Sequence, residues 1–255
     1  MPIAADIYYH LYSKNHKAAS PPIILIHGAG GTHLFWPPAI RRLSGYQVYA
    51  LDLPGHGKSD GRGLQSISAY SEVVLKWIAA IGIHRAIFIG HSMGSAISLL
   101  LALDNPEQVS ALALVGGGTR LQVSQILLDS TSNPTTFNNA VEKIVQWSFS
   151  PNSPQRIKEL AFQRMANTRP SVLHGDFLAC NEFNESGRIA NISQPTLVLC
   201  GLEDKMTPPH YSKLLANNIP NAHLEIIPDA GHMVMLEQPQ LVTRAIEEFL
   251  ITIEN

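Results

Sequence analysis

Short apolar runs alternate with helical patterns along most of this 255-residue chain, and no other feature constrains its fold as strongly. Strands buried on both faces are near-continuous aliphatic segments, and the helices that cover them carry one apolar stripe. Candidate strands lie at residues 7–12, 22–26, 47–53, 85–89, 109–115, 195–200 and 222–227. A helix is predicted at residues 67–81. A second helix is predicted after Pro239, where residues 241–250 carry an apolar stripe with helical spacing. The pattern predicts an α/β fold with a mostly parallel sheet and helices on both faces.

Residues 119–191 interrupt this alternation. They contain helical patterns at 120–129, 135–149, 154–167 and 171–183, prolines between them, and no convincing strand. A helical insertion between two strands predicts a cap, or lid, over one edge of the sheet. We therefore expect a core domain of residues 1–118 and 192–255 and a cap of residues 119–191.

The motif Gly-His-Ser-Met-Gly at residues 90–94 joins a predicted strand to a predicted helix. In this context a tight turn presents a serine hydroxyl next to the first N–H groups of a helix. Glycine at both ends of the motif lets the strand and the helix approach each other closely. Ser92 is therefore a candidate nucleophile.

A serine hydroxyl needs a base, and the base needs a group that orients it. His232 is the candidate base because it follows the strand at 222–227 and precedes the last helix. Asp204 is the candidate acid because it follows the strand at 195–200. Glu203 and Asp229 remain as alternative acids, and His210 and His223 are interpreted as structural.

Charge that develops on a substrate carbonyl needs two N–H donors, an oxyanion hole. The Met93 amide is one candidate because it follows the nucleophile. The second is expected in the glycine-rich loop at residues 27–31, with Ala29 as first choice and Gly30 as second. His27 of this loop is interpreted as a structural hydrogen-bonding residue.

Composition limits the possible partners. The net charge is −2, with no basic stripe that would suit nucleic acid. No apolar run approaches the roughly 20 residues that span a bilayer, and no secretion signal is recognisable, so a cytoplasmic protein is expected. Cys180 and Cys200 lack the spacing of zinc sites or disulfide frameworks, which predicts buried or half-buried thiols. A small neutral molecule is the expected partner of a monomer or homodimer.

Taken together, these residues make the chain resemble the α/β-hydrolase superfamily, specifically its capped carboxylesterase and lipase-like members, over essentially its whole length. The resemblance rests on the motifs at residues 27–30, 52–59, 90–94, 201–208 and 231–232. It implies eight strands, with the cap inserted after the sixth. It further implies Ser92 as nucleophile, His232 as general base and acid, Asp204 as orienting carboxylate, Ala29 and Met93 as oxyanion donors, and no cofactor or metal. The turn at 52–59 is interpreted as structural.

The expected reaction is hydrolysis of carboxylic esters of short to medium acyl chains through an acyl-enzyme. Candidate substrate contacts are Gly28, Gly30, Leu34, Phe35, Trp147 and Met233. Four arginines could instead recognise a carboxylate if they pointed inward, namely Arg120, Arg164, Arg169 and Arg188. The alternatives left open are a monoacylglycerol lipase, an enol-lactonase, a carbon–carbon bond hydrolase, a perhydrolase and a non-catalytic ligand receptor of the same fold.

Overall fold

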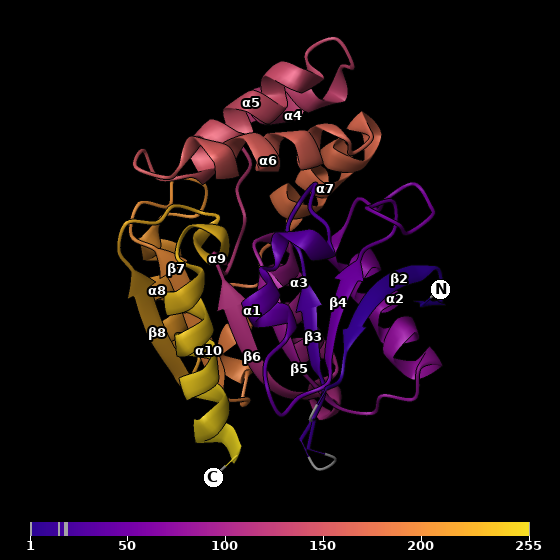
Figure 1. The fold of residues 1–255 in the computed structure, drawn as a ribbon, viewed down its shortest axis with the longest axis vertical. Helices are drawn as coiled ribbons and strands as arrows, with labels where there is room; N and C mark the ends of the chain where they lie inside the picture. The colour runs from indigo at the N-terminus through magenta and orange to yellow at the C-terminus, as the bar shows by residue number, and fades with distance from the viewer. Residues whose placement is uncertain (1, 15, 18–19, 255) are drawn as a thin grey trace.

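The computed structural model describes residues 2–14, 16–17 and 20–254. Its centre is an eight-stranded sheet in the order β1-β2-β4-β3-β5-β6-β7-β8 (Figure 1). β1 pairs antiparallel with β2 and β2 antiparallel with β4, whereas every other neighbouring pair is parallel. The strands are β1 (Ile3–Ala4), β2 (Ile7–Tyr12), β3 (Ile23–Ile26), β4 (Val48–Asp52), β5 (Ala86–His91), β6 (Val109–Val115), β7 (Thr196–Gly201) and β8 (Ala222–Ile227). The predicted fold class is confirmed.

Successive side chains of a strand point to opposite faces of the sheet, so the central strands contribute side chains to two separate core layers. Ile23 and Leu25 of β3 lie in the layer with α1 (Pro38–Arg41) and α10 (Pro239–Glu254). Ile24 and Ile26 lie in the other layer, which contains buried residues of α2 (Ile67–Ala80), α3 (Met93–Asp104) and α8 (Pro209–Asn218). Helices therefore cover both faces, and the helices predicted at 67–81 and behind Pro239 are both present.

Short helical segments complete the body of the molecule. They are η1 (His33–Phe35), η2 (Pro106–Gln108), η3 (Ile189–Asn191) and α9 (Val234–Glu237). Cys180 and Cys200 are buried free thiols, as predicted. In the described part of the chain, no helix is long and apolar enough to cross a membrane.

Four helices between β6 and β7 lie above the carboxyl ends of the strands, at the top of Figure 1. They are α4 (Gln125–Ser132), α5 (Phe137–Ser148), α6 (Gln155–Ala166) and α7 (Pro170–Glu182), and we call residues 119–191 the helical insertion. The helix predicted from residue 120 begins only at Gln125. The residues before it pair with the chain that leaves α7: Arg120 forms an antiparallel bridge with Asn184, and the Glu185 N–H donates to Thr119 O at 2.8 Å. This long-range pairing overrides the local helical pattern.

Candidate active site

Ser92 lies in the turn between β5 and α3. Its backbone has φ 53° and ψ −114°, a region that costs free energy for a residue with a side chain. Its N–H donates to Val115 O at 2.8 Å, which fixes the turn to β6. A Cβ on Gly94 would collide with the backbone of Ile26, and one on Gly90 with the backbone of Gly94. Both glycines of the motif therefore permit the close crossing that presents Ser92.

His232 and Asp204 come from the loops after β8 and β7 and meet in the interior. His232 Nδ1 lies 2.8 Å from Asp204 Oδ2. Because a carboxylate accepts here, the neutral imidazole carries its proton on Nδ1 and leaves Nε2 as a base. The other oxygen, Asp204 Oδ1, accepts the backbone N–H groups of Met206 and Thr207, both at 2.8 Å. The carboxylate is therefore fixed and can orient the imidazole.

The alternative acids and bases lie elsewhere. Glu203 accepts the Ser150 hydroxyl at 2.7 Å. Asp229 and His210 are exposed, and so is His223. The geometry thus favours Asp204 and His232 among the candidates.

Two further residues surround this pair, and the sequence contained no signal for either. The Thr207 hydroxyl lies 2.9 Å from Asp204 Oδ2 and 3.1 Å from His232 Nδ1. Gly116 has a φ of +56°, and a Cβ there would lie 3.2 Å from the His232 ring. Both contacts limit how far the imidazole can move.

His91, directly before Ser92, is a second buried histidine of the site. Its Nε2–H donates to the backbone oxygen of His232 at 2.9 Å. Burial, and then the charge of His232, hold the pKa of His91 well below its ordinary value, so the ring is neutral at pH 7. The Gly-x-Ser-x-Gly pattern leaves this position open, which is why sequence analysis did not select it.

The loop at residues 27–31 runs beside Ser92. A Cβ on Gly28 would lie 3.1 Å from the Cβ of Ser92. His27 Nδ1–H donates to Gly28 O at 2.8 Å, and its Nε2 accepts the Leu53 N–H at 3.0 Å. Burial and the neighbouring His56 lower the pKa of His27 to about 4. With both nitrogens engaged, His27 has the structural place that was predicted for it.

Ala29 and Gly30, the two candidates for the second oxyanion donor, differ in whether their N–H groups are already hydrogen-bonded. The Gly30 N–H donates to Asp176 Oδ2 at 2.8 Å and is therefore occupied. For the N–H groups of Ala29 and Met93, no hydrogen bond is formed within the described residues. The geometry thus favours Ala29 over Gly30.

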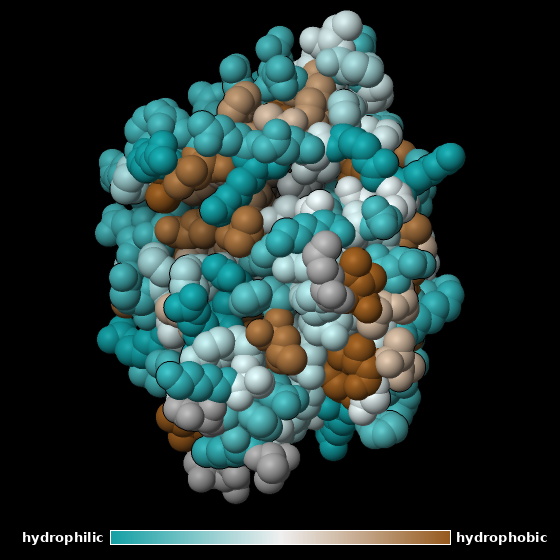
Figure 2. All heavy atoms as spheres, turned by 45° about the vertical axis from the view of Figure 1, so that its right-hand side comes forward, coloured by the Kyte–Doolittle hydropathy of each residue, from teal (hydrophilic) through white to brown (hydrophobic). Residues whose placement is uncertain are grey.

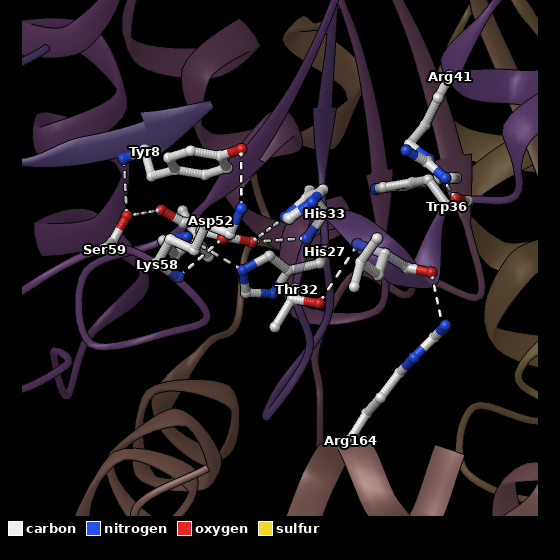
Figure 3. A network of polar contacts seen from close by, with 12 residues as sticks. Tyr8, His27, Thr32, His33, Trp36, Arg41, Asp52, Lys58, Ser59 and Arg164 are labelled. Carbon is white, nitrogen blue, oxygen red and sulfur yellow. Dashed lines mark hydrogen bonds and ion pairs between the residues drawn. The ribbon is translucent and has the colours of Figure 1, made fainter. Parts of the chain in front are cut away.

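The turn at residues 52–59 supports the far side of the loop. Asp52 Oδ1 accepts the His33 N–H at 2.7 Å and His33 Nδ1–H at 2.8 Å, and Oδ2 accepts the Lys58 N–H at 2.9 Å (Figure 3). Burial alone would raise the pKa of Asp52, but these hydrogen bonds outweigh it and the pKa is lowered. The contacts are those of a structural turn.

A cavity lies in front of Ser92, between the loop and the helical insertion. The centre of a water molecule can occupy about 30 Å³ of it, which is room for one or two waters. The lining residues are Gly28, Ala29, Phe35, His91, Ser92, Ile144, Ser148, Met165, Phe177, Met206, His232 and Met233. Apart from the two histidines, no titratable side chain of the described chain lines it. The cavity suits a small uncharged group.

The predicted substrate contacts divide into two sets. Gly28, Phe35 and Met233 line this cavity, whereas Gly30, Leu34 and Trp147 do not. Leu34 is 40% exposed. Ile144 and Ser148 are one helical turn apart on α5 and both line the cavity, whereas Trp147 has the Lys143 ammonium 5.5 Å from its ring centre. α5 therefore contributes Ile144 and Ser148 to the lining, in place of the predicted Trp147.

None of the four arginines considered above lines the cavity. Arg188 pairs with Asp104 at 2.8 Å and with Glu185 at 2.7 Å, and Arg120 is exposed. Arg164 donates to Leu34 O at 2.9 Å, as Figure 3 shows, and Arg169 donates to Gly61 O. A carboxylate in front of Ser92 would find none of these guanidinium groups in the cavity wall.

Comparison with known proteins agrees with this architecture. The sequence profile of the α/β hydrolase fold family matches residues 21–239. The chain therefore belongs to the α/β hydrolase fold family. It is a hydrolase of that fold, and its relatives act on several kinds of bond.

Two relatives cover nearly the whole chain. The putative carbamate hydrolase RutD of Caulobacter sp. (strain K31) is 27% identical, with 96% of both proteins covered. The 2-hydroxy-6-oxononadienedioate/2-hydroxy-6-oxononatrienedioate hydrolase of Burkholderia vietnamiensis is 28% identical, with 89% of this chain and 86% of that protein covered.

Among solved structures, a thermophilic esterase is 31% identical, with a TM-score of 0.81 and 97% and 98% of the two chains covered. The enol-lactonase of Burkholderia xenovorans LB400, at 21% identity and a TM-score of 0.88 with 96% of each chain covered, shares the fold.

Proposed function

We propose that this hydrolase is a carboxylesterase that cleaves esters of short to medium acyl chains through a Ser92-His232-Asp204 triad. One observation carries the proposal: Ser92 on its strained turn and His232, held by Asp204, line the same cavity. Ala29 lines it too, and no described group accepts its N–H.

The chemistry follows from these positions. Ser92 Oγ attacks the ester carbonyl while His232 Nε2 takes its proton, and the N–H groups of Ala29 and Met93 stabilise the oxyanion. Each such donor contributes about 10²- to 10³-fold in rate. The alcohol then leaves with the proton from His232, and a water activated by the same nitrogen releases the acid from the acyl-enzyme.

The lining of the cavity supports a neutral acyl group. Its walls are mainly apolar, from Phe35, Ile144, Met165, Phe177 and Met206. Acyl groups gain free energy by leaving water for such walls, whereas a buried carboxylate needs a charged partner. A dioate, such as the substrate in the name of the Burkholderia vietnamiensis relative, would find no cation there.

The helical insertion supplies three of these walls: Ile144 from α5, Met165 from α6 and Phe177 from α7. We therefore propose that residues 119–191 act as a cap on a core of residues 1–118 and 192–255. In Figure 2, hydrophobic side chains gather at the left of the view below the insertion, beside a hollow in the surface. We infer that acyl groups too long for the cavity extend toward this hollow.

A substrate panel tests the proposal. We expect hydrolysis of p-nitrophenyl esters, fastest for short to medium acyl chains and slow with palmitate. Ser92→Ala should lose almost all of this activity with an unchanged circular dichroism spectrum. A lactone, a carbamate, a monoacylglycerol and a vinylogous diketone belong in the same panel. Preference for one of these, or full activity of Ser92→Ala, would replace the esterase assignment.

A further inference from the structure

Asp176, on α7, is a fully buried carboxylate outside the triad. Its Oδ2 accepts the Gly30 N–H and His56 Nε2–H, both at 2.8 Å, and its Oδ1 accepts the Tyr70 hydroxyl at 2.6 Å. These donors belong to the 27–31 loop, the 52–59 turn and α2. One side chain of the helical insertion is thus bound to three parts of the core.

His56 compensates the charge of this carboxylate. Its Nε2 lies 2.8 Å from Asp176 Oδ2 and its Nδ1 lies 3.1 Å from Pro54 O, so both nitrogens face acceptors, which favours the imidazolium form. Burial opposes the imidazolium, but the charge and hydrogen bond of Asp176 outweigh it and raise the pKa of His56. The contacts thus favour a buried ion pair between Asp176 and His56.

The helical insertion also binds the backbone oxygen of Gly30. The Thr168 hydroxyl, between α6 and α7, donates to Gly30 O at 3.2 Å. Gly30 has a φ of +62°, and a Cβ there would lie 2.8 Å from Leu173 Cδ1 and 3.2 Å from Met165 Cγ. Gly30 is therefore in close contact with α6 and α7, and a larger residue would have to adopt a strained positive φ and displace these side chains.

The peptide planes on both sides of Ala29 are fixed by these contacts. On one side, Gly28 O accepts His27 Nδ1–H at 2.8 Å. Because a trans peptide is planar, the Ala29 N–H points away from His27. On the other side, the Gly30 N–H is fixed by Asp176. The core orients the first plane, which carries the Ala29 N–H. The insertion orients the second plane, which joins the first at the Ala29 Cα and so acts on that N–H from its other side.

We propose that Asp176 is a positioning residue for the oxyanion hole: by binding the Gly30 N–H it holds the loop so that the Ala29 N–H meets the developing oxyanion. This rests on the proposed esterase function. Oxyanion donors act over a narrow range of distances to the oxyanion, about 2.7–3.1 Å. If the contact between Gly30 and Asp176 is broken, the loop can shift, and the enzyme should then lose catalytic rate without losing affinity for the substrate. The site is complete only while α7 is docked.

Three variants test this. Asp176→Leu removes both carboxylate oxygens as acceptors. It should lower kcat at least about 10-fold and leave KM within about 2-fold of wild type. This loss of kcat is smaller than the loss caused by deleting an oxyanion donor outright. Asp176→Asn keeps one acceptor for Gly30 and should stay within about 3-fold of wild type. Tyr70→Phe removes a hydrogen bond of the same carboxylate without touching Gly30, and should lower the melting temperature but keep kcat.

A second readout separates positioning from general damage. In a thionoester the carbonyl oxygen is replaced by sulfur, a weak hydrogen-bond acceptor, so its turnover should fall less than that of the matching oxygen ester in Asp176→Leu. If that variant does not fold, Thr168→Val can be tested in its place, because it removes the hydrogen bond to Gly30 O. Its kcat should fall about 3-fold for the oxygen ester and should not fall for the thionoester.

Equal losses for both esters, or an unchanged kcat when the Gly30 contact is removed, would overturn the proposal. Failure of the esterase assignment looks different, since wild type itself would then be inactive or Ser92→Ala would remain active.

Discussion

At the scale of single residues, the site depends on backbone conformations that neighbouring groups hold in place. The strained conformation of Ser92 costs about 1–3 kcal/mol in general. The hydrogen bond from its N–H to Val115 O at 2.8 Å and the glycines at 90 and 94 make it tolerable. Asp204 is restrained just as closely, because both of its oxygens are hydrogen-bonded. We therefore expect changes at Asp204 to affect rate more than folding.

Asp204→Asn should lower kcat on the order of 10³- to 10⁴-fold, since an amide can present N–H to His232 and select the wrong tautomer. The melting temperature should change by only a few degrees. Ester hydrolysis under saturating substrate measures the first quantity and thermal unfolding the second. Asp229→Asn, at an exposed loop position, is the matched control and should retain full activity. Retention of more than a tenth of kcat in Asp204→Asn would contradict the assigned role.

At the scale of elements, β3, β5 and α3 cross so closely that no side chain fits between them. Gly94, in α3, faces the backbone oxygens of Ile26 and His27 at the end of β3. Backbone atoms cannot move aside as a flexible side chain can. The crossing that presents Ser92 is therefore also a packing constraint on the sheet.

Gly94→Ala should destabilise the fold by at least about 1–3 kcal/mol, the cost of overpacking a core. Denaturant unfolding measures it. Gly82→Ala is a useful comparison because no atom lies within 4 Å of a Cβ there, although its φ of +74° carries a cost of its own. A Gly94→Ala protein as stable as Gly82→Ala would show that the crossing is looser than described.

The cavity face of α5 should set the acyl-chain preference. Ile144→Ala enlarges the cavity in front of Ser92, so the longest efficiently hydrolysed p-nitrophenyl ester should gain two or more carbons, roughly matching the methylenes removed. kcat/KM across the ester series measures this. Gln146→Ala, exposed on the same helix, should leave the preference unchanged. An identical preference in Ile144→Ala and wild type would exclude this wall from acyl binding.

At the scale of the whole molecule, buried histidines link stability to pH. The pKa of His27 is lowered to about 4 by burial and by His56, and that of His91 lies well below its ordinary value. An unfolded histidine titrates near 6.5, so between about pH 6.5 and 4 these two histidines bind more protons in the unfolded chain than in the native one. Their contribution to stability therefore falls as the pH falls through this window. His56, with its raised pKa, acts oppositely: its contribution is present below about pH 6.5 and is lost as the pH rises through its native pKa.

Urea unfolding from pH 7 to pH 4 should show this loss, with about 3 kcal/mol from His27 alone. The variant His27→Asn keeps a donor and an acceptor but does not titrate, and its free energy of unfolding should depend less steeply on pH. Parallel curves for the two proteins would show that His27 is not responsible.

The sequence by itself determined the order of strands and helices, the turn at Ser92 and the loops that carry Asp204 and His232. These features are encoded by short-range patterns: aliphatic runs, helical stripes, and glycines at fixed spacing. It did not reveal β1, whose two residues carry no pattern, or the extended residues before Gln125.

Only the tertiary structure decided which N–H groups of the 27–31 loop are free, which helix faces line the cavity, and that Asp176 joins the helical insertion to the core. Asp176 and Gly30 are 146 positions apart. A contact of this kind arises from the packing of whole elements against one another, so neither residue's local sequence carries a trace of it.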